Sequence, residues 1–409
     1  MHMRHRVLGL VAPVFLATSA LAQRAVPMNP AGTAPVSPPG FNEPLPDGPF
    51  TYRTGEGQDI RVTVLARLAW PYALTFLPDG DLLIAQRSGQ IKRMPKGTTG
   101  LLPVGGGPVA VNGPVAGQAV HGYMAIAVHP QFQRNGWLYI VYTKPLPDNK
   151  RTTAVARSRY AGGALHDTTD VWVGENITGG PASLAMTPDA KLWIGTSGGM
   201  ADTAQDPASL AGKVLRLNDD GSVPPDNPFV GRDGHRPEIY TMGHRTTLAL
   251  TVHPVTGQVF LAEMGPNGGD EVNLLKAGAN YGWPVVSLGR TYPGPWQSKS
   301  NEPTHSGFEL PLVYWTPSIS VTGLSFYQGD ALPKWKGDLF VAGVRYGEIP
   351  NTGRVDRVVL NERLEEMRRE SLLTDLHQRI RDVKPGPDGF IYVATDMEQG
   401  AILRIEPAR

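Results

Sequence analysis

The chain has 409 residues, of which 41% are apolar, 18% charged and 8% aromatic, a composition typical of a globular protein and not of a disordered one. Gly (48) and Pro (38) are abundant, which favours a fold rich in turns and poor in long helices. Lysine plus arginine (38) nearly balance aspartate plus glutamate (37), so no broad basic field exists to bind nucleic acid or an anionic membrane surface. The absence of cysteine excludes disulfides, thiolate catalysis and cysteine-ligated metal centres. A small-molecule ligand is therefore favoured.

The first 22 residues have the order of a secretory signal peptide. Two arginines precede an apolar run over residues 7–20, and Ala20-Leu21-Ala22 has the small-residue pattern of a cleavage site. We expect cleavage after Ala22 and a periplasmic or secreted protein. The apolar run is too short to span a bilayer and no other run of about 18 apolar residues follows, so we expect no membrane anchor.

Residues 23–55 are rich in Pro, Gly and Ala without periodicity and are expected to form a flexible leader. From there on a hairpin pattern recurs, in which two apolar runs flank a turn rich in Pro, Asp or Gly. The six pairs of runs are 73–77 with 82–84, 125–128 with 138–141, 184–186 with 192–194, 250–252 with 259–261, 324–327 with 339–341, and a run from 383 with 391–393.

Each repeat of about 50 to 75 residues is long enough for a four-stranded sheet, and such a sheet needs neighbours to cover both of its faces. We therefore predict an all-β fold, a six-bladed β-propeller formed by residues 56–409. Two all-β sandwiches in tandem are the alternative, although no linker composition divides the repeats.

Several stretches of the chain form a distinctive set of motifs. They are 212–218 (GKVLRLN) with 220–229, 243–245 (GHR), 265–271 (GPNGGDE) with 279–284 (ANYGWP), 315–319 (WTPSI) and 379–383 (RIRDV). Over about residues 60–407 the chain thereby resembles the soluble quinoprotein glucose/sorbosone dehydrogenases, also called aldose sugar dehydrogenases. The resemblance implies a six-bladed propeller that oxidises a sugar or a related hydroxyl or aldehyde substrate with pyrroloquinoline quinone (PQQ) and calcium, and passes electrons to an external acceptor.

The resemblance also assigns four arginines to the cofactor. PQQ is a flat ortho-quinone with three carboxylates, so its site needs fixed cations, and guanidinium groups bind carboxylates through two hydrogen bonds. Arg379 and Arg381, two residues apart on an extended segment, would point to one face. Arg245 matches the arginine beside the reacting quinone oxygens, and Arg345 stands where relatives commonly have a lysine. A solvated surface cation is the alternative for any one of them, but we expect all four to converge at one end of the propeller axis.

Three further assignments concern calcium and the substrate. Gly265 and Pro266 match a pair whose backbone carbonyls bind calcium in the family. Asp270 and Glu271 either add negative charge to that site or cap a loop. Trp315 matches an aromatic residue that borders the sugar pocket, with packing in the core as the alternative.

The catalytic positions depart from the family pattern. Gly179 stands at the position of the family's base histidine, Ser183 at that of an arginine, Thr246 at that of an asparagine and Val120 at that of a glutamine. Loss of a general base costs about 10²- to 10⁴-fold in rate, so we expect weak or altered dehydrogenase activity. His121 is the candidate replacement base because an unperturbed histidine titrates near neutral pH, and an exposed loop histidine is the alternative reading.

Other classes of function stay open at this stage. Residues 195–199 (GTSGG) fit the G-x-S-x-G pattern of a hydrolase nucleophile elbow, although a glycine-rich turn has the same letters. A calcium-dependent propeller lactonase would need an axial calcium with Asn, Asp and Glu ligands and no quinone. A propeller that binds its ligand without chemistry would need neither.

Overall fold

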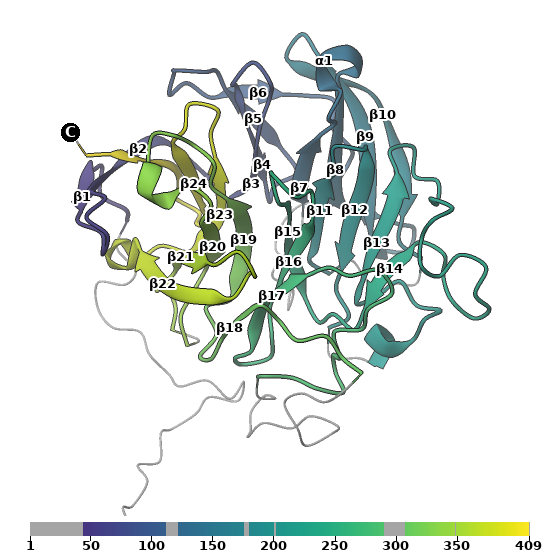
Figure 1. Cartoon of the computed structure of the whole chain (residues 1–409). Coiled ribbons are helices and arrows are strands. Elements are labelled where there is room, and N and C mark those ends of the chain that lie inside the picture. The colour runs from purple at the N-terminus through teal and green to yellow at the C-terminus, as the bar shows by residue number, and fades with distance from the viewer. Residues whose placement is uncertain are drawn as a thin grey trace, which may run out of the picture.

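The computed structural model describes residues 44–111, 122–175, 180–199, 202–289, 307–347 and 349–408. Six antiparallel sheets stand in a ring around a central axis (Figure 1). The predicted all-β, six-bladed propeller is therefore confirmed. The first strands of successive sheets contact one another all the way round the ring, which excludes the tandem-sandwich alternative.

Each of the first five blades is a four-stranded meander in chain order. Blades 1 to 3 consist of β3 (Pro71–Phe76), β4 (Leu82–Gln86), β5 (Ile91–Met94) and β6 (Leu102–Val104); β7 (Tyr123–Val128), β8 (Trp137–Pro145), β9 (Arg151–Ala161) and β10 (Ala164–Val173); and β11 (Ala182–Met186), β12 (Lys191–Thr196), β13 (Lys213–Asn218) and β14 (Ile239–Met242). Blades 4 and 5 consist of β15 (Thr247–Val252), β16 (Val259–Glu263), β17 (Asp270–Leu274) and β18 (Val313–Trp315), and β19 (Val321–Phe326), β20 (Leu339–Gly343), β21 (Arg354–Leu360) and β22 (Glu366–Leu372).

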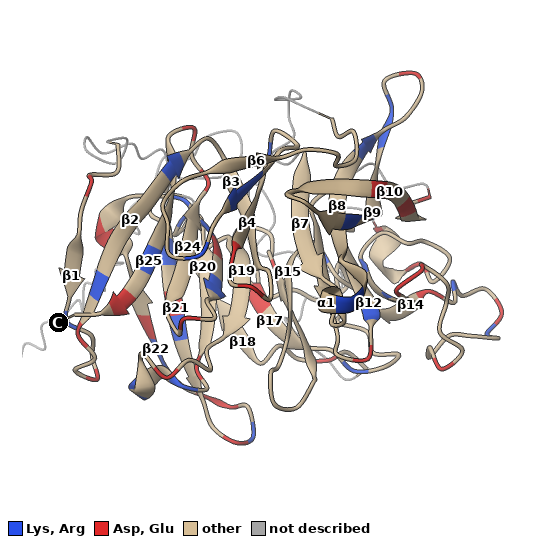
Figure 2. Cartoon of the chain, turned by 90° about the horizontal axis from the view of Figure 1, so that it is seen from above, with Lys and Arg blue, Asp and Glu red and all other residues tan. Residues whose placement is uncertain are grey.

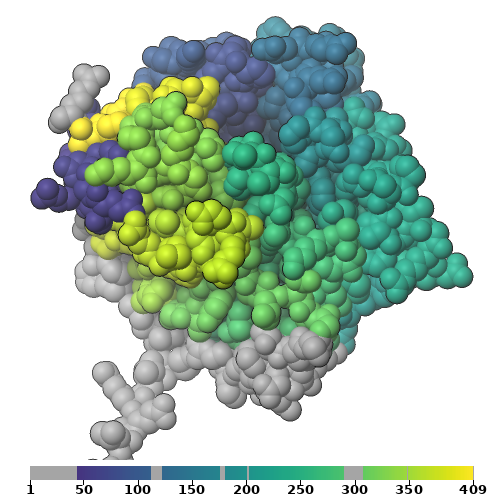
Figure 3. Space-filling view, viewed as in Figure 1, coloured from purple at the N-terminus to yellow at the C-terminus, as the bar shows by residue number. Residues whose placement is uncertain are grey.

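Blade 6 closes the ring with both ends of the chain. Its strands β23 (Ile380–Pro385), β24 (Ile391–Thr395) and β25 (Gly400–Pro407) are completed by β2 (Ile60–Leu68), which pairs with β25, and by β1 (Phe50–Tyr52) at the edge. Figure 3 shows the purple N-terminal segment beside the yellow C-terminal one. The leader predicted for residues 23–55 therefore ends too late, because β1 already belongs to the sheet and Leu45 is buried in the core.

The predicted hairpins are the first two strands of each blade, such as β3 with β4 and β23 with β24. Helices are short in the described parts of the chain: α1 (Phe132–Asn135) and the 3-10 turns η1 (Asp202–Gln205), η2 (Pro333–Trp335) and η3 (Thr374–Leu376). None of the described helices has the length and apolar character needed to cross a membrane. Basic and acidic residues are scattered over the strands and loops, in keeping with the balanced composition (Figure 2).

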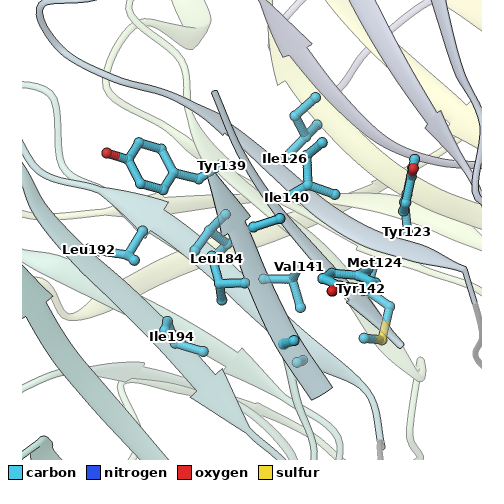
Figure 4. Close-up of a cluster of buried hydrophobic side chains, with 14 of the residues drawn as sticks. Tyr123, Met124, Ile126, Tyr139, Ile140, Val141, Tyr142, Leu184, Leu192 and Ile194 are labelled. Carbon is cyan, nitrogen blue, oxygen red and sulfur yellow. The ribbon is translucent and has the colours of Figure 1, made fainter. Parts of the chain in front are cut away.

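The core lies between neighbouring blades. Figure 4 shows part of it, where Tyr139 and Val141 of β8 lie on the side of Leu184 of β11 and Leu192 of β12, while Ile140 lies on the other face of β8 beside Ile126. These side chains are buried because each sheet is covered by the next one. Truncation of one of them to alanine removes transfer energy and leaves a cavity, at a cost of about 2–5 kcal/mol.

The first strand of each blade, its inner strand, runs in the same direction as those beside it. Thr322 and Ser325 of β19 donate side-chain hydrogen bonds to the carbonyls of Ile380 and Val383 of β23, at 3.0 and 2.9 Å, with a constant offset along both strands. Side chains from all six inner strands line a narrow axial channel. We call the end of the channel at which the inner strands begin the mouth. The second strand of every blade is antiparallel to the first and therefore ends at the mouth.

Five inner strands carry a register irregularity near the mouth, whereas β11 of blade 3 pairs regularly with β12. A β-bulge redirects one side chain relative to the usual alternation. The extra residues are Tyr72, Met124, Leu248, Thr322 and Arg381. One predicted cofactor arginine is thus placed by a bulge.

Candidate active site

The backbone brings the four predicted cofactor arginines to the mouth. Arg245 stands two residues before β15, Arg345 two residues after β20, Arg379 directly before β23, and Arg381 is the second residue of β23. Inner strands begin and second strands end at the mouth, so all four side chains start from the same end of the channel. They come from three successive blades, 4, 5 and 6.

Asp396 is the centre of an arginine cluster at this mouth. It directly follows β24, is only 1% exposed, and its backbone N–H donates to the Arg379 carbonyl at 2.8 Å. Arg379 Nη2 lies 3.6 Å and Arg381 Nη1 4.0 Å from Asp396 Oδ2. Arg87 Nη1 donates to the other oxygen, Asp396 Oδ1, at 3.3 Å. One carboxylate therefore faces three guanidinium groups.

Sequence reasoning missed Arg87 and Asp396. Each is the first residue after the second strand of its blade, so the two occupy equivalent positions in blades 1 and 6, which are neighbours in the ring. A comparison of the repeats at the ends of their second strands would have revealed opposite charges at equivalent positions.

The arginine cluster carries a net positive charge, because its guanidinium groups outnumber the carboxylate that they face. Arg381 Nη2 is buried without a hydrogen-bond partner, and the guanidinium carbon lies 3.6 Å from the centroid of the Tyr72 ring. Burial lowers the pKa of Arg381 to about 10. Burial, together with the charges of Arg345 and Arg87, lowers the pKa of Arg379 against the opposing effect of Asp396. A buried cationic group with an unused donor is costly unless an anion binds it, so the chemistry of this site fits a ligand with carboxylate groups.

Arg245 belongs to a small pocket of blade 4. Its Nη1 donates to the carbonyls of Met264 and Gly265, at 2.9 and 2.8 Å, and its guanidinium carbon lies 5.4 Å from the centroid of the Trp283 ring. Glu263 and Glu271 line the same pocket. Burial and the charge of Glu263 raise the pKa of Glu271 well above the usual value of a carboxyl group.

Glu263 and His244 fix the backbone from which Arg245 projects. Glu263 Oε2 accepts the backbone N–H of Arg245 at 2.8 Å, and its Oε1 lies 2.8 Å from His244 Nδ1. The imidazole is fully buried and its Nε2 lies 2.9 Å from Thr241 Oγ1. Both ring nitrogens are therefore engaged, and His244 positions the loop instead of facing a ligand.

The predicted calcium residues Gly265 and Pro266 line the pocket of Arg245. Asp270 is completely buried, and its oxygens accept the N–H of Gly265 at 3.1 Å and the hydroxyl of Ser318 at 2.7 Å. Burial raises the pKa of Asp270 to about 6. Asp270 thus caps the loop that presents the Gly265 carbonyl, which is one of the two roles the sequence left open. Among the described residues, no group of three or more His, Cys, Asp or Glu side chains could hold a metal ion, so a calcium site here would depend on backbone carbonyls.

Trp315 lies in the core between blades 4 and 5. It is 4% exposed, its Nε1 donates to Asp356 Oδ2 of β21 at 2.7 Å, and the guanidinium of Arg369 covers its ring at 4.7 Å. These contacts are those of a packed core residue, the alternative that the sequence offered. Contact with a substrate stays a prediction.

The described part of blade 3 presents a different surface at the mouth. Residues 180–186 and 194–199 contain no ionisable side chain, and Ser183 Oγ is buried without a hydrogen-bond partner. The hydrolase elbow is not formed, because β12 continues into a glycine-rich loop and Ser197 Oγ donates to the Pro181 carbonyl. Residues 1–22, His121 and Gly179 lie outside the described residues, so the signal peptide and the two catalytic assignments stay predictions.

The comparisons with known proteins place this six-bladed propeller in a family. The family model described as glucose/sorbosone dehydrogenase matches residues 68–404. Aldose sugar dehydrogenase YliI of Escherichia coli (strain K12) is 33% identical over 358 residues, which cover 85% of this chain and 93% of that protein. The crystal structure of the soluble aldose sugar dehydrogenase of Escherichia coli in its apo form is similar at a TM-score of 0.77, with 32% identity over 85% of this chain and all of the other. The PQQ-bound form of the aldose sugar dehydrogenase from Streptomyces coelicolor is similar at a TM-score of 0.64, with 25% identity over 85% of this chain and 98% of the other.

The chain therefore belongs to the glucose/sorbosone dehydrogenase family. The family membership expected from the motifs is confirmed, and with it the class of oxidoreductase.

Proposed function

We propose that the protein binds PQQ at the mouth of the propeller and oxidises a sugar or a related hydroxyl or aldehyde substrate. The observation that carries the proposal is the arginine cluster, in which Arg379, Arg381 and Arg87 all lie within 4.0 Å of the carboxylate of Asp396. Its excess of positive charge is what a ligand with several carboxylates requires. Relatives named as an aldose sugar dehydrogenase and as a PQQ-bound enzyme support the same ligand.

Two groups of arginines on different sides of the mouth would bind different parts of PQQ. Arg379, Arg381 and Arg345 would hold the carboxylates, while Arg245, fixed by Glu263, would donate from blade 4 to the quinone oxygens. When bound, PQQ would supply a quinone that accepts a hydride from the substrate. An external electron acceptor would then complete the cycle.

Calcium is proposed as the second component. The carbonyl oxygen of Gly265 already accepts Arg245 Nη1, but a carbonyl has a second lone pair, and calcium prefers oxygen ligands of this type. Asp270 would keep the loop in the conformation that presents this carbonyl together with Pro266. The oxygen donors of this loop thus fit the ion.

The base that takes the substrate proton is proposed to be His121. Gly122, the residue after it, packs at the mouth, since a Cβ on Gly122 would come within 1.9 Å of the Arg87 carbonyl oxygen. Gly179 has no group that could accept a proton, so turnover on aldoses would be slow. Export through a signal peptide at residues 1–22 is part of the proposal and rests on the sequence alone.

Reconstitution of the purified protein with PQQ and calcium tests this function. We expect a saturable change in the quinone absorbance and sugar-dependent reduction of an artificial dye, both decreased by a calcium chelator. A folded protein that leaves the PQQ spectrum unchanged would contradict the proposal and favour a calcium-dependent lactonase or a binding propeller. N-terminal sequencing of the exported protein tests the leader, with Gln23 as the expected first residue.

A further inference from the structure

Arg87 is the cation of the cluster that no family motif assigned, and it approaches the cluster from a different blade. It follows β4 in blade 1, and its guanidinium carbon lies 5.1 Å from the centroid of the Trp70 ring. Its backbone is fixed as well, because the Arg87 N–H donates to the Trp70 carbonyl at 3.2 Å. Arg87 thus reaches Asp396 across the seam where blades 1 and 6 meet.

The two oxygens of Asp396 are divided between the two blades. Arg87 Nη1 donates to Oδ1 at 3.3 Å, whereas the nearest nitrogens of Arg379 and Arg381 lie 3.6 and 4.0 Å from Oδ2. A guanidinium group and a carboxylate prefer a two-fold, parallel pair of hydrogen bonds. Arg87 occupies the oxygen that Arg379 would need for such a pair, so Arg379 stays only loosely bound to Asp396.

Asp396 is therefore a competitor for any anionic ligand of the cluster. If Arg87 were absent, the buried carboxylate would pair fully with Arg379 and draw that guanidinium away from a ligand. Only two guanidinium groups, those of Arg379 and Arg381, would also remain beside Asp396, so the net positive charge of the cluster would be smaller. Both effects weaken the binding of an anion.

We propose that Arg87 is a positioning residue of the cofactor site, which occupies Asp396 Oδ1 and thereby keeps Arg379 and Arg381 available for the carboxylates of the ligand. This inference rests on the proposed function, since PQQ is the ligand concerned. Arg87 acts through Asp396 and does not itself contact the ligand.

The affinity for PQQ, measured by titration of the quinone absorbance, tests this role in a set of variants. Arg87→Gln should weaken binding about tenfold, the size of one misplaced charge-assisted hydrogen bond. The double variant Arg87→Gln with Asp396→Asn should regain an affinity within about threefold of the wild type, because the competing carboxylate is gone. Arg87→Lys keeps the charge and should bind better than Arg87→Gln.

A matched control is Arg93→Gln, which removes another arginine of blade 1 whose partner is Asp81 at 3.0 Å, away from the cluster. It should leave the PQQ affinity unchanged. If the double variant stays as weak as Arg87→Gln, Arg87 contacts the ligand itself and the inference is wrong; it is equally wrong if Arg87→Gln binds like the wild type. A wild type that fails to bind PQQ would instead overturn the proposed function.

Discussion

Blades 3 and 6 each bury one cation near the mouth, and the two cations are treated in opposite ways. Lys213, the first residue of β13, is completely buried, and its Nζ donates to the carbonyls of Thr203, Ala204 and Ala211 at 2.8, 3.1 and 2.9 Å. Arg381 of blade 6 is 5% exposed, yet its Nη2 has no partner. All donors of the lysine are engaged within the protein, whereas Nη2 of the arginine, which carries two N–H groups, has no partner.

This difference indicates that Lys213 is a structural cation and that Arg381 is available to bind a ligand. Burial lowers the pKa of Lys213 to about 7, and that of Arg381 to about 10, so both groups are costly to bury. The cost of Lys213 is offset by the loop around η1 that it holds in place. The Tyr72 ring and Asp396 offset part of the cost of Arg381, but its Nη2 has no hydrogen-bond partner, and this is the physical basis for an anion site in blade 6 and not in blade 3.

The largest effect is expected from Lys213→Met. Three buried carbonyls would lose their donor, and an unsatisfied buried acceptor costs about 1–3 kcal/mol, so the free energy of unfolding should fall by about 3 kcal/mol or more. Urea denaturation measures this loss. The PQQ affinity of the folded protein should stay within about twofold of the wild type, and a large loss of affinity without a loss of stability would reverse the assigned roles.

Arg381→Gln should show the opposite pattern. We expect the PQQ affinity to fall about 100-fold, because a buried charge-assisted contact is lost, while the free energy of unfolding changes by less than about 1 kcal/mol. Absorbance titration and urea denaturation of the same preparation give both numbers. A variant that is strongly destabilised but binds PQQ normally would show that Arg381 is structural.

Gly179→His would restore the histidine that the resemblance assigns to this position as the general base. With PQQ and calcium bound, turnover on aldoses should rise about tenfold, a part of what a well-placed base contributes. His121→Ala should lower whatever activity the wild type has. Steady-state rates with an artificial acceptor decide the matter, and equal rates in wild type and both variants would show that neither position supplies the base.

The smallest effect is expected at Ser183 of blade 3. Its hydroxyl is buried and makes no hydrogen bond, so Ser183→Ala removes an unsatisfied polar group and should change stability by no more than about 1 kcal/mol, toward greater stability. The PQQ affinity should not change. A marked loss of affinity would place Ser183 in the binding site and end the contrast between the two blades.

The fold was predictable because the sequence pattern of a hairpin occurs six times along the chain. Six hairpins with turns such as Pro78-Asp79-Gly80 define six sheets, and each sheet needs neighbours on both faces. Ring closure was not predictable, because β1 and β2 carry no hairpin signal of their own and are recruited by the free edge of β25.

The site was predictable where single residues stand in motifs. Arg245, Arg379 and Arg381 were located in this way, but Arg87 and Asp396 matter through a contact across the seam between two blades, and their 309-residue separation leaves no local pattern. Trp315 shows the converse, since its motif suggested a pocket while its indole packs against Asp356 and Arg369.

The central claim is that the arginine cluster recognises carboxylate groups. It is tested most directly by titrating the purified protein with PQQ and with its trimethyl ester, which keeps the quinone and the ring system but carries no negative charge. We predict saturable binding of PQQ and an affinity for the ester at least about 100-fold lower, the loss expected when charge-assisted hydrogen bonds are removed. Equal affinity for both compounds would contradict the account.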